Sequence, residues 1–356
     1  MKTYPEDEVQ LPLRIEELTA ELLTELLSFR YPGVVVKSLY LGDVILGTAA
    51  KVRLLLAYNA AGHQAGLPAT MVLKIGFVSQ EVRELVGSSY AKEIRFFRDW
   101  APRMGIKLPQ FHFAGVDAAG QGALLMEDLS ARNVTFGSAT VPLPVSVAPV
   151  ALDQLARLHA FWWKDGELEE LDTYPGVLGG VADTFFSVEH WDRLMAMPRG
   201  RFIKGELRDR KRMYAAMKAL FYLKENGTNF MLHGDPHPGN LSFDADGSPN
   251  FLDWQGVQRG PWAHDVTYFI IGSLSVGDRR ENEKALLGHY LEKLAAHGGP
   301  KIGFDEAWMM YRRHAIYEFI NALTPTEYQP EPVGEAHAER GCAALEDLGT
   351  LEALCV

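Results

Sequence analysis

The sequence predicts an α+β protein in two parts, a small antiparallel sheet followed by a larger helical part. Up to about residue 127, apolar residues occur in short runs of the length and composition typical of strands. From residue 151 onward they recur mainly at helical spacing. Residues 138–149, in between, are rich in proline and poor in helix signals. We therefore predict two domains, residues 1–128 and 129–356.

The first part begins with a predicted amphipathic helix over residues 14–29, where Leu18, Leu22 and Leu26 recur at helical spacing. Turns follow at Gly42–Gly47 and at residues 62–68. A second helix is predicted over residues 80–100. Strands are predicted at 34–41, 49–58, 69–77, 110–115 and 122–127. Strands, one long helix and then more strands favour an antiparallel sheet with a helix packed on it.

The second part starts with a helical pattern, ALDQLARLHAFWW, at residue 151. Two further helical patterns occupy residues 305–323 and 336–354. The only strand signals here are short, at residues 229–232, 241–244 and 250–252. This part is therefore predicted to be a helical body that carries a few short strands.

Composition narrows the class of partner. The chain has 35 Lys and Arg against 46 Asp and Glu, a formal net charge of −11, which disfavours nucleic acid as a partner. No apolar run approaches the roughly 18 residues of a membrane span. The acidic start is unlike a secretory signal, and Cys342 and Cys355 do not form a disulfide framework. We predict a cytoplasmic protein with neither a membrane nor a nucleic-acid partner.

Oxygen-bearing side chains gather in one stretch, residues 231–270. Two short apolar strands flank the sequence HGDPHPGN, and a third leads into Asp253. Asp235, Asn240 and Asp253 all follow short strands on Gly- and Pro-rich turns, which suits a site held by rigid elements. Magnesium prefers hard oxygen ligands of these types, completed by water and phosphate.

The same residues carry a resemblance to a known family. His233, Asp235 and Asn240 match the kinase catalytic loop H-x-D-x-x-x-x-N, and Asp253 resembles the metal-binding Asp of the DFG element, here Asp-Trp-Gln. HGD, HPGN and DWQ together resemble the aminoglycoside phosphotransferase and choline kinase superfamily. DWQ and the later HDVTYF look most like its ecdysteroid-kinase-like branch. The resemblance implies a two-lobed protein-kinase-like fold, with ATP and Mg²⁺ as cofactors.

Upstream residues extend the resemblance. Lys74 ends the strand MVLK and Glu93 follows nineteen residues later in KEIRFF, the order and spacing of the family's phosphate-binding ion pair. In the family, the hinge that contacts adenine through its backbone falls where this chain has Met126, Glu127 and Leu129. Gly47 lies in the turn that corresponds to the phosphate loop, although this turn departs from the G-x-G-x-x-G of protein kinases.

The resemblance also implies a role for each residue. Asp235 would accept the proton of the attacking hydroxyl or orient that hydroxyl. Asn240 and Asp253 would hold Mg²⁺ across the phosphates, and Lys74 would bind oxygens of the α- and β-phosphates. Asp265 would brace the catalytic loop by accepting backbone N–H bonds.

One spacing bears on the acceptor. Asp253 and Asp265 are only twelve positions apart, which leaves no room for the activation segment on which protein kinases dock peptides. The predicted acceptor is therefore a hydroxyl of a small molecule, and peptide substrates are disfavoured.

Other readings of the same residues stay open. His233, Asp235 and His237 alternate as H-x-D-x-H, which could ligate a metal in a hydrolase. A nucleotide-binding module without catalysis is a second alternative. His233 is expected to fix its loop, and the role of His237 is open. Two groups have either a structural or a substrate role: Phe161, Trp162 and Trp163, and the acidic residues Glu167, Glu169, Glu170 and Asp172.

Overall fold

The structure is a computed structural model that describes residues 9–47, 49–77, 89–163, 168–169, 171–223 and 229–356. The chain divides into two compact units, which we call unit 1 (up to Val134) and unit 2 (from Thr135). The sequence placed this change at residue 128. The assignment of nucleotide binding to the first part and substrate binding to the second stays a prediction.

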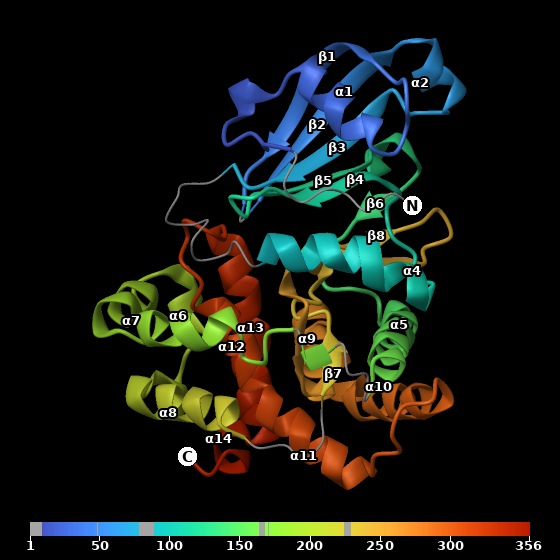
Figure 1. The fold of residues 1–356 in the computed structure, drawn as a ribbon. Coiled ribbons are helices and arrows are strands. Elements are labelled where there is room, and N and C mark those ends of the chain that lie inside the picture. The colour runs from blue at the N-terminus through green and yellow to red at the C-terminus, as the bar shows by residue number, and fades with distance from the viewer. Residues whose placement is uncertain (1–8, 48, 78–88, 164–167, 170, 224–228) are drawn as a thin grey trace. The chain divides into compact units, whose positions relative to one another are not determined.

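Unit 1 contains a five-stranded sheet in which every neighbouring pair is antiparallel, which confirms the predicted sheet. Its spatial order is β1 (Val36–Ile45), β2 (Ala50–Tyr58), β3 (Thr70–Ile75), β5 (Gly122–Glu127) and β4 (Phe111–Val116). The helix α1 (Ala20–Ser28) lies against this sheet (Figure 1) and buries Leu23, Leu26 and Leu27 in the same apolar core. Alternating apolar residues on the strands and one apolar helix face thus make this core.

The predicted helix over residues 80–100 is less regular than expected. Residues 89–95 are helical, residues Phe96–Trp100 form a wider π turn, and α4 (Ala101–Met104) follows. Pro102 lies at the start of α4, where its missing N–H interrupts the regular hydrogen-bond ladder. Residues 80–88 of the predicted helix lie outside the described residues.

A short helix, α2 (Ala60–Gln64), occupies part of the region predicted to be a turn. Its start is set by Asn59, whose side-chain oxygen accepts the Gly62 N–H at 3.1 Å. Asn is among the best residues at this capping position, so Asn59 marks in the sequence where this helix starts.

Unit 2 is helical, as predicted. Its helices are α5 (Ala148–Phe161), α6 (Val177–Phe185), α7 (Val188–Met195), α8 (Arg210–Phe221), α9 (Trp262–Ser273), α10 (Val276–Ala296), α11 (Phe304–His314), α12 (Ile316–Ala322), α13 (Glu331–Leu348) and α14 (Thr350–Ala353). Every residue of α9 is buried, because α5, α10, α11, α12 and α13 all pack against it. This central helix carries Asp265 in its first turn.

Two small sheets flank the stretch from His233 to Asn240 in unit 2. One pairs β7 (Phe230–Leu232) with β10 (Gln258–Gly260), and the other has the order β6 (Thr135–Phe136), β8 (Leu241–Phe243), β9 (Pro249–Phe251). The three short strands expected near residues 230, 242 and 250 are confirmed. The sequence did not predict β6 (Thr-Phe) and β10 (Gln-Arg-Gly), because neither contains the short apolar run that marks β7 and β8.

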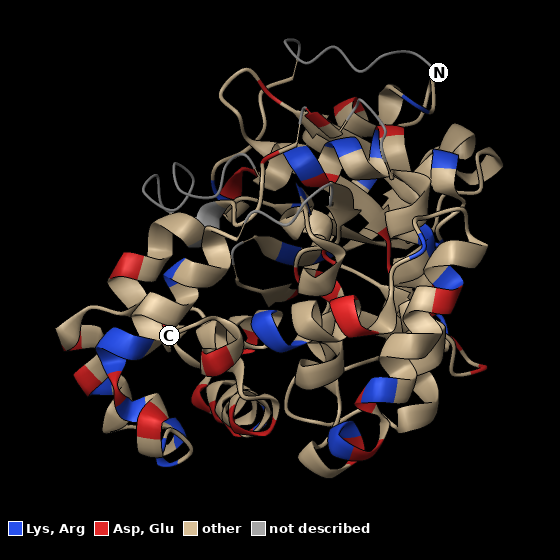
Figure 2. Ribbon diagram, turned by 90° about the horizontal axis from the view of Figure 1, so that it is seen from below, with Lys and Arg blue, Asp and Glu red and all other residues tan. Residues whose placement is uncertain are grey.

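Charged residues of both signs are interspersed along the helices in the view of Figure 2. Across the described ranges, no helix combines the length and the apolar character that a membrane crossing requires.

Candidate active site

The segment His233–Asn240, which we call the HGD loop, connects β7 to β8. It lies backbone against backbone on the turn that follows Asp253. Gly234 has φ +86°, and a Cβ on it would lie 2.0 Å from the carbonyl oxygen of Gly256. A Cβ on Gly256 would in turn lie 2.9 Å from the His233 carbonyl oxygen. Both glycines are needed for this close approach. No role for Gly256 was predicted from the sequence.

Asp265 anchors the start of the HGD loop, as predicted. Its Oδ2 accepts the His233 N–H at 2.7 Å and its Oδ1 accepts the Gly234 N–H at 2.9 Å. His159 of α5 lies 3.2 Å from Oδ2 through Nε2, and its Nδ1 is 2.7 Å from the Tyr290 hydroxyl. Burial acts to raise the pKa of Asp265, but the hydrogen bond and charge of His159 outweigh it and lower the pKa. The brace is therefore a buried carboxylate.

His264 is a second anchor of the HGD loop, which was not predicted from the sequence. Its Nε2 lies 3.1 Å from the Gly234 carbonyl oxygen. Burial lowers the pKa of His264 to about 4, so the ring is neutral and donates its single N–H to that carbonyl. The ring also stacks edge-on against Tyr317, with 4.1 Å between centroids. The only feature of the sequence that could have indicated this role is the position of His264 next to Asp265.

His233 fixes the HGD loop, as expected. Its Nε2 is 3.0 Å from the Leu252 carbonyl oxygen, and its Nδ1 accepts the Asp235 N–H at 3.2 Å. The Leu252 N–H donates to the Asn240 carbonyl oxygen at 2.8 Å. These bonds join both ends of the loop to the residue that precedes Asp253.

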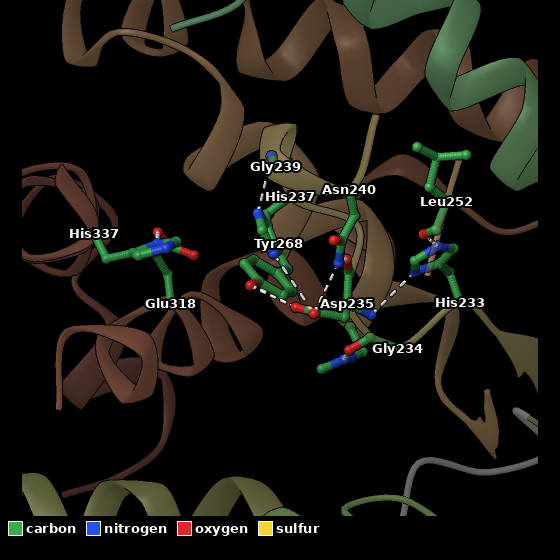
Figure 3. A network of polar contacts seen from close by, with 11 residues as sticks. His233, Gly234, Asp235, His237, Gly239, Asn240, Leu252, Tyr268, Glu318 and His337 are labelled. Carbon is green, nitrogen blue, oxygen red and sulfur yellow. Dashed lines mark hydrogen bonds and ion pairs between the residues drawn. The ribbon is translucent and has the colours of Figure 1, made fainter. Parts of the chain in front are cut away.

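Asp235 projects from the middle of the HGD loop with both carboxylate oxygens occupied (Figure 3). Oδ1 accepts the Tyr268 hydroxyl at 2.8 Å, and Oδ2 accepts Asn240 Nδ2 at 2.9 Å. His237 Nε2 lies 3.6 Å from Oδ2. The Asp235 side chain is 45% exposed, so molecules in solution can reach it.

The electrostatic environment keeps Asp235 ionised. Burial acts to raise its pKa, but the positive charge and hydrogen bond of His237 and the hydroxyl of Tyr268 outweigh burial and hold the pKa at about 2. Conversely, burial acts to lower the pKa of His237, and the Asp235 carboxylate raises it overall. Asp235 is thus an anion that can accept a hydrogen bond from a hydroxyl at neutral pH.

Asn240 and Asp253 have the donor atoms that Mg²⁺ prefers. Asn240 Nδ2 donates to the Asp235 carbonyl and to Oδ2, which turns the amide oxygen of Asn240 away from Asp235. Asp253 has φ +59°, and among the described residues only Cys355 shares a left-handed backbone without being glycine. Such strain recurs at functional sites. No group of three or more His, Cys, Asp or Glu in the described part of the chain is arranged to hold a metal.

The predicted ion pair of unit 1 is present. Lys74 Nζ on β3 lies 2.7 Å from Glu93 Oε1 on the helix of residues 89–95, and both side chains are buried. Because both side chains are buried, solvent does not screen the attraction between them. The Glu93 carboxylate therefore holds the Lys74 ammonium in one place. The role of the pair in nucleotide binding stays a prediction.

The remaining predicted nucleotide residues occupy two places in unit 1. Met126 and Glu127 end β5, and Leu129 begins the 3₁₀ turn η3 (Leu129–Ala131). Gly47 lies in the turn between β1 and β2, where a Cβ would make ordinary contact with Ala49 at 3.6 Å, so the space there does not demand glycine. Their contacts with a nucleotide stay predictions.

The aromatic triplet divides between core and surface. Trp162 is completely buried, Phe161 is exposed, and Trp163 stacks on Phe230 with 5.4 Å between ring centroids. Of the four acidic residues, Glu169 and Asp172 are exposed, whereas Glu167 and Glu170 lie outside the described residues.

Known proteins share this fold. Choline kinase from Cryptosporidium parvum Iowa II matches with a TM-score of 0.54 at 11% identity, over 94% of this chain and 95% of its own. Choline kinase LicA from Streptococcus pneumoniae matches with a TM-score of 0.50 at 12% identity, over 93% and 98%. The GDP and kanamycin complex of APH(2")-IIia matches with a TM-score of 0.50 at 11% identity, over 93% and 98%.

Sequence comparisons give the family. An uncharacterized kinase-like protein of Caenorhabditis elegans is 32% identical over 75 residues, which are 21% of this chain and 19% of that protein. The chain therefore matches about a fifth of that relative's length. The model of the Phosphotransferase enzyme family matches residues 66–309, well over half of the chain and the whole stretch from β3 to the braced HGD loop and beyond. On this match, the chain belongs to the phosphotransferase enzyme family.

Proposed function

We propose that this protein is an ATP- and Mg²⁺-dependent kinase that transfers the γ-phosphate to a hydroxyl group of a small molecule. The observation that carries the proposal is the geometry of the HGD loop. Asp235 is held as an ionised, partly exposed carboxylate next to Asn240, and Asp253 is tied to the same loop. Membership of the phosphotransferase family and a fold shared with choline kinases support it.

Each residue has a defined task in this proposal. Asp235 orients the acceptor hydroxyl and accepts its proton, while Asn240 and Asp253 hold the metal through their side-chain oxygens. The metal, when bound, neutralises charge on the phosphates. Most of the rate comes from positioning and charge stabilisation, because phosphoryl transfer asks for little covalent chemistry from the protein.

The residues of unit 1 serve the nucleotide. Lys74, held by Glu93, binds oxygens of the α- and β-phosphates. Met126, Glu127 and Leu129 contact the base through the backbone, and Gly47 lies in the turn over the phosphates.

The acceptor is a small hydroxyl compound rather than a peptide. All of the residues between Asp253 and Asp265 belong to the turn η9 (Trp254–Gly256), to β10 or to the start of α9 and their short connections. No stretch is left there for a peptide-docking segment. The resemblance to the ecdysteroid-kinase-like branch and the aromatic content favour a moderately apolar acceptor, and the composition favours a cytoplasmic location.

The direct test is an ADP-release screen with MgATP over alcohols, aminoglycosides and steroids. We expect acceptor-dependent ADP release with at least one class. MgATP binding without turnover on any acceptor would instead indicate a binding module. Stoichiometric bound zinc with no response to MgATP would indicate a hydrolase.

Asp253→Asn tests the proposed metal ligand separately. Asparagine tolerates the left-handed backbone about as well as aspartate, so the fold is expected to persist. The carboxylate is lost, so the increase in Tm that MgATP gives the wild type should largely disappear. In the wild type, MgATP at a hundred times its Kd would stabilise the folded state by about 2.7 kcal/mol. Differential scanning fluorimetry with and without MgATP measures this.

The matched control is Asp246→Asn in the exposed turn between β8 and β9, which should keep the full increase. An undiminished MgATP effect in Asp253→Asn would remove Asp253 from the metal site.

A further inference from the structure

His237 uses its two ring nitrogens for two different contacts. Nδ1 accepts the Gly239 N–H at 3.0 Å and thereby caps the short turn η8 (Pro238–Asn240). Nε2 points to the other side and lies 3.6 Å from Asp235 Oδ2. The ring therefore bridges the backbone of the HGD loop and the carboxylate that the loop presents (Figure 3).

The surroundings leave the ring little freedom to turn. A Cβ on Gly239 would lie 2.7 Å from His237 Cε1, so the loop passes directly beneath the ring. The Tyr268 ring of α9 lies 6.2 Å from the His237 ring between centroids, and the His337 ring of α13 meets it edge-on at 6.1 Å. The side chain is only 20% exposed.

His337 is held in place by a contact with Glu318. Its Nδ1 lies 2.6 Å from Glu318 Oε1, and both side chains are buried. Gly272 and Gly341 leave room for this carboxylate, because a Cβ on either would come within 3.1 Å of the Glu318 side chain. A buried hydrogen-bonded pair that joins α12 to α13 therefore lies behind His237.

The cap contact also determines where the proton of the neutral ring lies. Because Nδ1 accepts a backbone N–H, the proton of the neutral imidazole is on Nε2, the atom that faces Asp235. Asp235 Oδ2 accepts a hydrogen bond from Asn240 on one side, and on the other side the Nε2–H of His237 faces it at 3.6 Å, an electrostatic contact longer than a hydrogen bond, while Tyr268 holds Oδ1. These donors together restrict rotation of the carboxylate.

We propose that His237 is a positioning residue for Asp235: Nδ1 shapes the HGD loop, and Nε2–H holds the carboxylate in the orientation that phosphoryl transfer requires. The inference rests on the proposed function. The sequence left the role of His237 open, and this inference assigns it one. The role consists of two contacts, and substitutions can remove them one at a time.

Two amide substitutions separate these contacts. In His237→Asn the amide oxygen takes the place of Nδ1 and keeps the cap, but nothing reaches Asp235. In His237→Gln the longer side chain brings an N–H to the position of Nε2 and loses the cap. We expect His237→Asn to keep the wild-type Tm and lose about tenfold or more in kcat with the nucleotide KM unchanged. His237→Gln should lose Tm and keep most of kcat.

The proposal would be overturned if His237→Asn had wild-type kcat, or if Tm and kcat fell in parallel in both variants. The matched control is the same pair of substitutions at His297, whose Nε2 lies 3.0 Å from Asp153 Oδ1 on another part of unit 2. Neither His297 variant should change kcat.

A measurement without turnover distinguishes this inference from the proposed function. A two-bond ¹H–¹⁵N spectrum of the wild type, at a pH where His237 is neutral, should show its proton on Nε2. A proton on Nδ1 would refute the inference even if the enzyme transfers phosphate. A wild type that phosphorylates no acceptor would refute the proposed function, whatever the tautomer.

Discussion

Replacing Asp235 by asparagine is expected to lower kcat for phosphoryl transfer by roughly 10²–10⁴-fold, the usual contribution of a positioned general base. An amide cannot accept the acceptor's proton, and it presents only one oxygen to the three donors that now surround the carboxylate. The wild-type carboxylate is ionised throughout the neutral range, since its pKa is about 2. The nucleotide KM should stay unchanged, because Asp235 has no proposed contact with the nucleotide.

A coupled ADP-release assay measures this effect on any acceptor that the screen identifies. Asp246→Asn serves again as the control, since it makes the same chemical change in the neighbouring hairpin. The Tm of both variants must be recorded, because a misfolded HGD loop would also lower kcat. Turnover of Asp235→Asn within a few-fold of wild type would exclude Asp235 as the base.

Gly234→Ala is expected to abolish activity and to destabilise unit 2. A left-handed backbone costs a non-glycine residue about 1–2 kcal/mol. Overpacking adds about 1–3 kcal/mol, because the new Cβ would lie 2.0 Å from the Gly256 carbonyl oxygen, and backbone cannot move aside as a flexible side chain can. The HGD loop would have to separate from the turn after Asp253, which would misplace Asp235 relative to Asp253.

Gly247→Ala measures the backbone contribution alone, so the difference between it and Gly234→Ala gives the cost of overpacking. Gly247 has φ +81°, close to that of Gly234, but a Cβ on it would have no atom within 4 Å. The Gly247→Ala variant should therefore lose only the stability that the left-handed backbone costs an alanine, and it should keep the wild-type kcat. Thermal denaturation and ADP release, measured on both variants, give the comparison. Equal losses in the two variants would show that the loop does not depend on the Gly234–Gly256 approach.

Much of the fold was predictable because its signals are local. The strands of the five-stranded sheet follow from short apolar runs, and α5 and the helices from α11 to α14 follow from an apolar period of 3.6 residues, which a stretch of chain shows by itself. The helices from α6 to α10 were not predicted one by one. The spacing from His233 to Asn240, Asp253 and Asp265 was equally readable, since one continuous stretch of chain carries all four. The partnership of Lys74 with Glu93 was inferred from the family's spacing and is present in the structure.

The tertiary structure alone decided which distant groups support that stretch. His159 reaches Asp265 across 106 residues, and the His337–Glu318 pair approaches the HGD loop from two helices near the end of the chain. Gly256 matters only because another backbone packs on it, and the two nitrogens of His237 acquire different tasks only once Gly239 and Asp235 lie on opposite sides of the ring. Apolar periodicity and residue spacing indicate the local conformation of a single segment of the chain. Contacts between segments depend on how whole elements pack, which no local pattern records.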